Sequence, residues 1–134
     1  MLDGGCLCGR IRYHVQGEPV FQAACHCRDC QKQSGSAFSV VVGVPSALLE
    51  LTGELSVYAC KGDSGAEVRR FFCGHCGSPI YSAPGGDGPL VFLKAGTLDD
   101  VSGLDPKVNI WCDSAWPATR FADDAMKVAR NPAM

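Results

Sequence analysis

Apolar and polar residues alternate along much of this chain, and the alternation predicts short β-strands rather than long helices. In the first predicted strand, Ile11, Tyr13 and Val15 share one face. Arg12 and His14 lie between them and face the other way, which is typical of a half-buried strand. Similar patterns predict further strands at residues 20–24, 37–44, 49–52, 55–60, 66–72, 80–81, 90–95 and 107–112.

Helix-favouring residues gather in only two places. Residues 28–33 contain good helix formers, and Ser34 and Gly35 should end a helix there after one or two turns. Residues 45–48 begin with proline and favour one more helical turn. The short polar segment 61–65 most simply closes a β-hairpin. We therefore predict a mainly β fold with one or two short helical turns.

Length and composition narrow the class of protein. The 134 residues predict a single domain, 1–134, with one core. A net charge of −2 gives no reason to expect nucleic acid or an anionic membrane as a partner, and no apolar run approaches the ~20 residues of a membrane span. The Met1–Asp3 start lacks the features of a secretory signal, so we expect a cytoplasmic protein. The oligomeric state is left open.

Nine cysteines are the unusual feature of the composition. In a reducing compartment, clustered cysteines more often bind metal or take part in catalysis than form disulfides. Nine is also an odd number, so the cysteines cannot all pair as disulfides within the chain. The sequence therefore indicates metal binding.

Three motifs contain seven of these cysteines. They are C-x-C at Cys6 and Cys8, C-x-C-x-x-C at Cys25, Cys27 and Cys30, and C-x-x-C at Cys73 and Cys76. Four-thiolate zinc sites usually combine two pairs that lie far apart in the sequence. The simplest division assigns the first and last motifs to one closed structural zinc site. The middle motif then forms a second zinc site with three ligands and one open position, which is the mark of a catalytic zinc.

Alternatives remain for the other candidate residues. A single metal with the remaining thiols as passive core residues is the alternative to two sites. Cys60 and Cys112 are expected to be small buried hydrophobic residues, and Trp111 and Trp116 to be core residues. His26 lies between two predicted ligands, so it should point away from the metal and could orient a ligand by hydrogen bonding. Of the remaining histidines, His75 is expected to face solvent, and no role is expected for His14.

The ordered motifs resemble the family of glutathione-dependent formaldehyde-activating enzymes and centromere protein V. The matching segments are Gly5–Gly9, Cys25–Cys30, Ser34–Gly35, Arg70–Ser78 and Gly96–Asp100. The resemblance implies an Mss4-like β-tent with two zinc sites. It also implies that the structural zinc is bound by Cys6, Cys8, Cys73 and Cys76 and the catalytic zinc by Cys25, Cys27 and Cys30. One departure is Asn109, which stands where many relatives have histidine before Ile-Trp.

The family reaction would join glutathione to formaldehyde as S-(hydroxymethyl)glutathione, a carbon–sulfur lyase or synthase activity. Three thiolates on Zn²⁺ leave a net charge of −1, so such a site suits a thiolate ligand better than activation of water. A fourth thiolate adds another negative charge, and Arg28 and Lys32 are candidates to compensate it. The expected partners are therefore a glutathione-type thiol and a small aldehyde.

Two other functions are compatible with the motifs. In a non-catalytic zinc module, Cys60, Cys112 or a histidine would close the second site. In a redox or metal-responsive switch, the three-thiolate site would release its metal on oxidation. A fourth protein ligand at the second site would favour the structural module, and an open position would favour chemistry.

Overall fold

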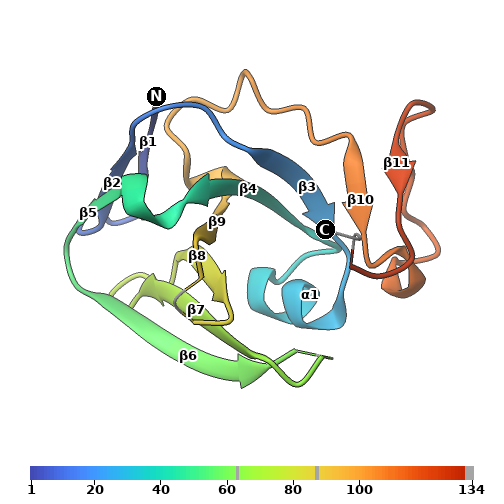
Figure 1. The fold of residues 1–134 in the computed structure, drawn as a ribbon, viewed down its shortest axis with the longest axis horizontal. Coiled ribbons are helices and arrows are strands. Elements are labelled where there is room, and N and C mark those ends of the chain that lie inside the picture. The colour runs from blue at the N-terminus through green and yellow to red at the C-terminus, as the bar shows by residue number, and fades with distance from the viewer. Residues whose placement is uncertain (63, 87, 132–134) are drawn as a thin grey trace. The chain divides into compact units, whose positions relative to one another are not determined.

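The computed structural model describes residues 1–62, 64–86 and 88–131, and the protein is mainly β over these ranges, as the sequence predicted (Figure 1). The chain forms two compact units. The first unit contains Met1–Phe21 and Val42–Gly103, and the second contains Gln22–Val41 and the chain from Leu104 onward. A single cooperative domain over 1–134 stays a prediction.

Three antiparallel strands begin the first unit, in the order β1-β2-β5. They are β1 (Leu2–Gly5), β2 (Arg12–Val15) and β5 (Leu49–Thr52). The predicted alternation is confirmed, because Ile11, Tyr13 and Val15 are all buried. Strand β1 was not predicted, since aspartate and glycine are uncommon in strands. Its Gly4 is required by close packing: a Cβ there would lie 2.4 Å from the Thr97 carbonyl oxygen.

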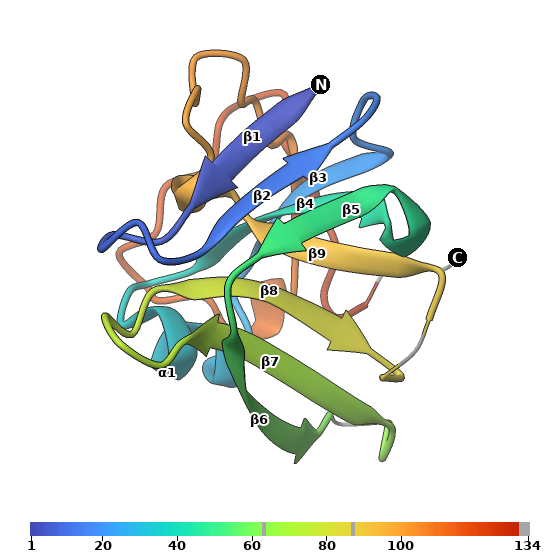
Figure 2. The same cartoon turned by 90° about the vertical axis from the view of Figure 1, so that its left-hand side faces the viewer.

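Four further antiparallel strands follow in the first unit, in the order β9-β8-β7-β6 (Figure 2). They are β6 (Leu55–Lys61), β7 (Glu67–Cys73), β8 (Pro79–Pro84) and β9 (Leu90–Lys94). The predicted hairpin is confirmed, with Leu55 opposite Cys73 in β6 and β7. Strand β7 therefore ends on the first cysteine of the C-x-x-C motif. The 3₁₀ turns of this unit are η1 (Ser46–Leu48) and η2 (Ala95–Thr97).

The second unit contains the helix and the C-x-C-x-x-C motif. Its elements are β3 (Phe21–Cys25, whose first residue belongs to the first unit), α1 (Arg28–Ser34), β10 (Val108–Ile110), η3 (Cys112–Ser114) and β11 (Met126–Lys127). Strand β4 (Ser39–Pro45) contributes residues to both units. Strand β10 pairs in parallel with β3 and with β11. Strand β3 therefore delivers Cys25 next to Ile110, its register partner in β10.

Helix α1 begins and ends as its sequence predicted. The Cys27 thiol caps its N-terminus by accepting the backbone N–H of Cys30 at 3.2 Å. Gly35 ends the helix in the left-handed conformation, with φ of 68°, and its N–H donates to the Gln31 carbonyl at 2.8 Å. The cysteine motif and the helix are thus one local structure.

The last predicted strand, 107–112, is shorter in the structure. Strand β10 ends at Ile110, because Trp111 adopts a left-handed backbone conformation with φ of 58°. A bulky residue is rarely found there, and a hydrophobic pattern carries no signal of such a turn. Strand β11, at Met126–Lys127, lies in the tail for which the sequence predicted no element.

Within the residues described, no helix has the length and apolar character needed to cross a membrane.

The Gly96–Asp100 segment of the family resemblance is bound to β1 and β2. The Arg12 guanidinium donates to both carboxylate oxygens of Asp99, at 2.9 and 2.5 Å. The hydroxyls of Tyr13 and Thr97 lie 2.8 Å apart, and the Asp99 N–H donates to the Asp3 carbonyl at 2.8 Å. These contacts give the segment a structural role in the first unit.

We expect Asp99→Asn to lower the Tm slightly at pH 7 and to have a smaller effect as the pH falls towards about 4, the ordinary pKa of an aspartate, and below it. The hydrogen bond from Arg12 lowers the pKa of Asp99. The carboxylate therefore contributes stability above its unfolded pKa, and this contribution is lost as the pH falls through the folded value. Thermal melts across this range measure the difference, with the exposed Asp123→Asn as control. A deficit in Tm that is the same at every pH would contradict the assignment.

Candidate metal centres

The first cysteine cluster assembles two segments of the first unit. Cys6 and Cys8 lie in the loop between β1 and β2, Cys73 ends β7, and Cys76 lies in the turn before β8. The four sulfur atoms all lie within 4.8 Å of one another. Two of the separations are 3.5 Å, between Cys6 and Cys8, and 3.8 Å, between Cys8 and Cys73. A tetrahedral zinc–thiolate site requires about 3.8 Å. The donor set therefore fits a four-coordinate zinc.

Backbone amides orient these thiols. The N–H of Ile11 donates to the Cys6 sulfur at 3.2 Å. In the C-x-x-C turn, the Cys73 N–H donates to the Ser78 carbonyl at 2.9 Å, and the Gly77 N–H donates to the Cys73 carbonyl at 2.8 Å. Gly77 has a φ of 81°, a conformation that glycine adopts without strain. The glycine after the motif is thus explained by the turn.

Ser78 connects the two halves of the four-cysteine cluster, although no sequence pattern predicts an individual role for it. Its hydroxyl oxygen accepts the Leu7 N–H at 3.0 Å and lies 3.2 Å from the Cys76 sulfur. Because the oxygen is an acceptor for Leu7, its own hydrogen is available to the sulfur. This hydrogen bond and one from the Ser78 backbone are the largest of the causes that lower the pKa of the Cys76 thiol to about 5. Ser78 therefore favours the thiolate form that a metal requires.

We expect Ser78→Ala to make zinc in this cluster easier to remove, with affinity reduced by about tenfold. The variant loses the hydrogen bond to the Cys76 sulfur and the contact that holds the loop at Leu7. Competition with a coloured chelator at pH 7 measures the change. Ser102→Ala, which removes a hydroxyl bonded to Asp100 elsewhere in the same unit, serves as the control. Equal zinc affinity in both variants would contradict the role of Ser78.

The second cluster consists of Cys25, Cys27 and Cys30, all in the second unit. Their sulfur atoms lie within 4.8 Å of one another; Cys25 and Cys30 are buried, and Cys27 is half-buried. Among the described residues, no fourth His, Cys, Asp or Glu completes the group. A purely structural module would need a fourth ligand to close this site, and the described part of the chain supplies none of these four types.

The second cluster also fits a metal cation. Contact with the Cys27 and Cys30 thiols, together with burial, raises the pKa of Cys25. Three adjacent thiols, two of them buried and one half-buried, therefore do not readily ionise together in the absence of a positive charge. A bound divalent cation would supply that charge and would favour all three thiolates.

A buried amide supports the second cluster. Gln31 is 4% exposed, and its Nε2 donates to the carbonyl oxygens of His26 at 2.8 Å and Ser114 at 3.0 Å. Its Oε1 accepts the Trp116 indole N–H at 2.9 Å and a hydrogen bond from Arg28. Sequence reasoning missed Gln31, because a glutamine in a short helix is ordinarily exposed.

His26 points into the core. It is 1% exposed, its Nε2 lies 2.9 Å from the Asn109 Oδ1, and its ring packs against Phe38 and Phe121. It does not belong to the cysteine cluster, as predicted. Asn109, the position that departs from many relatives, is itself buried at 8% exposure. The position at which this chain differs from many relatives is therefore a buried one, whose side chain is hydrogen-bonded to His26, a residue outside the cysteine cluster.

The expectations for Cys60, Cys112 and the two tryptophans were partly wrong. Cys60 and Cys112 belong to neither cluster, but both are half-buried rather than buried. Trp116 is 48% exposed, and Trp111 is half-buried. Apolar character alone does not distinguish core positions from exposed ones. Of the other histidines, His75 is exposed as predicted, and His14 is bonded to Asp3.

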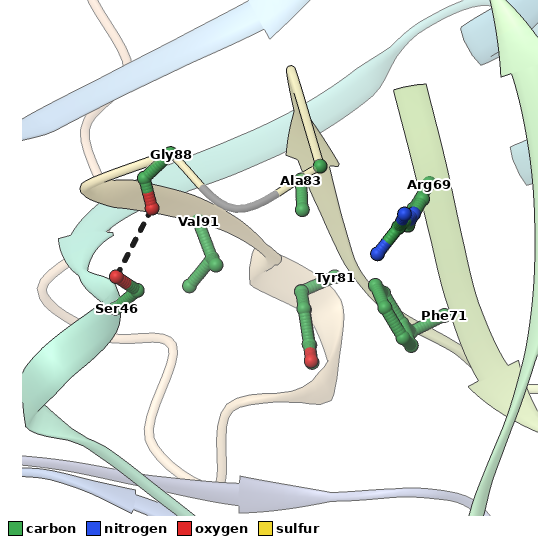
Figure 3. A pocket seen from close by; sticks show the side chains of 8 residues that line it. Ser46, Arg69, Phe71, Tyr81, Ala83, Gly88 and Val91 are labelled. Atoms are coloured by element: carbon green, nitrogen blue, oxygen red, sulfur yellow. Dashed lines mark hydrogen bonds between the residues drawn. The ribbon is translucent and has the colours of Figure 1, made fainter. Parts of the chain in front are cut away.

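The first unit also has an open pocket of about 330 Å³ (Figure 3). The stacked rings of Phe71 and Tyr81, with centroids 4.5 Å apart, form one wall. The polar groups there have partners, since Ser46 donates to the Gly88 carbonyl and Arg69 to the Glu67 carboxylate. None of the clustered cysteines lines the pocket, so the candidate chemistry lies elsewhere.

Comparison with known families places most of the chain in one of them. The family described as glutathione-dependent formaldehyde-activating enzyme matches residues 1–114. The chain belongs to this family. The family relationship suggested by the ordered motifs is therefore confirmed.

Curated fungal relatives carry provisional names as glutathione-dependent formaldehyde-activating enzymes. A protein of Emericella nidulans is 33% identical over 76 residues, which cover 57% of this chain and 38% of the relative. A protein of Penicillium rubens is 30% identical over 105 residues, which cover 76% of this chain and 54% of the relative. A protein of Aspergillus flavus is 28% identical over 107 residues, which cover 76% of this chain and 56% of the relative. The chain thus spans 38 to 56% of the length of these relatives.

A solved structure supports the fold. The crystal structure of a Rhodobacter sphaeroides protein aligns with a TM-score of 0.58 at 17% identity and covers 78% of this chain and 92% of that protein. At this identity the likeness concerns the fold alone.

Proposed function

We propose that this protein is a zinc-dependent carbon–sulfur enzyme that joins a glutathione-type thiol to a small aldehyde. With glutathione and formaldehyde the product is S-(hydroxymethyl)glutathione. The observation that carries the proposal is the cluster of Cys25, Cys27 and Cys30 without a fourth ligand of the metal-binding types among the described residues. Membership of the formaldehyde-activating family supports the choice of substrates.

The two clusters would have different roles. Cys6, Cys8, Cys73 and Cys76 would bind a structural zinc, since four thiolates complete a tetrahedron. Cys25, Cys27 and Cys30 would bind the catalytic zinc and leave one position for the substrate sulfur. When bound there, zinc would supply the positive charge that keeps the substrate sulfur deprotonated and fixed in place.

The reaction needs no oxidant or reductant. The thiolate sulfur forms a bond to the aldehyde carbon, the carbonyl π bond breaks, and its electron pair goes to oxygen, which takes a proton. The charge of the incoming thiolate has to be balanced. Arg28 directly follows Cys27 and forms no ion pair with another described residue, so it is the best placed cation. Lys32, the other candidate, is exposed on the same helix.

Exchange spectroscopy with ¹³C-formaldehyde and glutathione tests the proposal, because adduct formation also occurs without a catalyst. We expect the protein with two zinc ions to accelerate exchange between free formaldehyde and the adduct. Protein stripped of the second zinc should lose this effect. An exchange rate that is the same with and without zinc-loaded protein would overturn the proposal.

A further inference from the structure

Gln31 uses every hydrogen-bonding position of its side-chain amide. Its two N–H groups donate to the carbonyl oxygens of His26 and Ser114, and its oxygen accepts from Arg28 and Trp116. An amide has two donors and one oxygen with two lone pairs, so these four partners leave no capacity unused. They also determine which end is oxygen and which is nitrogen.

These bonds connect the three-cysteine cluster to a surface beside it. His26 lies between Cys25 and Cys27 in the chain, and Gln31 directly follows Cys30. Gln31 is therefore next to one cysteine of the cluster in the chain, and its side chain is hydrogen-bonded to a residue that lies between the other two. Ser114 and Trp116 lie in the segment after β10, so Gln31 also holds that segment next to the cluster.

The same oxygen brings a cation and an aromatic ring together. Because Arg28 and Trp116 both donate to the Gln31 Oε1, the bonded nitrogens of the guanidinium and the indole lie within roughly 6 Å of each other. Both side chains are exposed, and Trp116 keeps 48% of its surface accessible although its N–H is bonded to a buried group. A large aromatic side chain that is held in place yet exposed is typical of a binding surface.

We propose that Arg28 and Trp116 bind the part of the thiol substrate that does not react, with Arg28 receiving its carboxylate, and that Gln31 positions both. The inference rests on the proposed function and names its substrate class as a thiol that carries a carboxylate. A guanidinium pairs with a carboxylate through two parallel N–H donors, and Arg28 has several donors besides the one that bonds Gln31. Trp116 provides a flat apolar wall for the atoms between the sulfur and the carboxylate.

Two small thiols of similar size distinguish binding of the carboxylate from binding of the sulfur. 3-Mercaptopropionate carries both groups, whereas 2-mercaptoethanol has a hydroxyl in place of the carboxylate. Trp111→Phe leaves Trp116 as the only tryptophan, so its fluorescence reports binding beside the cluster. Trp111 bonds Asn131 and not Gln31, so its removal leaves this surface in place. In this background, with two zinc ions bound, we expect Arg28→Gln to weaken the binding of 3-mercaptopropionate by about tenfold more than the binding of 2-mercaptoethanol.

Further variants separate positioning from folding. Gln31→Met keeps the length of the side chain, and we expect it to shift the Trp116 emission and to remove the preference for the carboxylate while zinc content stays at two. Arg28→Lys keeps the charge and should restore part of the preference. Arg120→Gln removes another exposed arginine of the second unit and should leave both affinities unchanged.

The outcomes distinguish this inference from the function on which it rests. If Arg28→Gln weakens both thiols equally or neither, the binding surface is wrong and the proposed reaction still stands. If Gln31→Met changes neither the emission nor the preference, Gln31 has only a structural role. If zinc-loaded protein binds no thiol at all, the proposed function and this inference both fail.

Discussion

Replacing Cys73 by serine is expected to destabilise the protein far more than replacing Cys30. The four-cysteine cluster joins the loop between β1 and β2 to the end of β7, two segments that are distant in the sequence. Zinc in such a closed site contributes directly to folding, on the order of 10 kcal/mol in isolated zinc peptides. The three cysteines of the second cluster come from six consecutive residues, so their metal closes no long loop.

Thermal melts of the zinc-loaded variants measure this difference. Cys73→Ser should unfold at a much lower temperature or fail to fold, and Cys76→Ser should behave in the same way. Cys60→Ser is the matched control, because Cys60 is half-buried in the same unit and belongs to neither cluster. Equal losses for Cys73→Ser and Cys30→Ser would contradict the division into structural and catalytic sites.

Cys27→Ser is expected to reduce adduct formation to the uncatalysed rate in a folded protein with about one zinc. Cys27 belongs to both the C-x-C and the C-x-x-C pair, so its loss leaves Cys25 and Cys30 without the ligand between them. Its sulfur also caps α1 through the Cys30 N–H, and a serine hydroxyl can replace that cap. Serine is a poor zinc ligand at neutral pH, so the metal site should be lost while the helix remains.

Metal analysis, circular dichroism and the exchange assay together test this expectation. The four-cysteine cluster belongs to the first unit and should keep its zinc. A variant that retains two zinc ions and full adduct formation would show that the chemistry lies elsewhere.

Sequence patterns predicted most of the strands because burial on one face imposes a period of two. The hairpin of β6 and β7 and the helical turn after Cys27 were predicted with nearly correct bounds. The patterns failed where local geometry prevails over hydrophobicity. Strand β1 is rich in glycine because Gly4 packs against Thr97, and β10 ends early because Trp111 turns the chain.

The cysteine clusters could be predicted because metal ligands recur at short spacings, and the structure brings together both predicted groups. Their metal and their separate roles stay predictions. The residues around them could not be predicted, since Ser78 and Gln31 act through hydrogen bonds to partners that only the fold brings close. Their residue types are common, and neither has a spacing that sets it apart.

The most direct test of the central claim is the electronic spectrum of the protein with cobalt(II) in both sites, recorded with and without glutathione. Seven cysteine sulfurs belong to the two clusters, and an open position at the second should admit an eighth. We predict that glutathione increases the thiolate-to-cobalt charge-transfer absorption of the wild type and leaves Cys27→Ser unchanged. A wild-type spectrum that does not respond to saturating glutathione, with two cobalt ions bound, would contradict an open thiol-binding site.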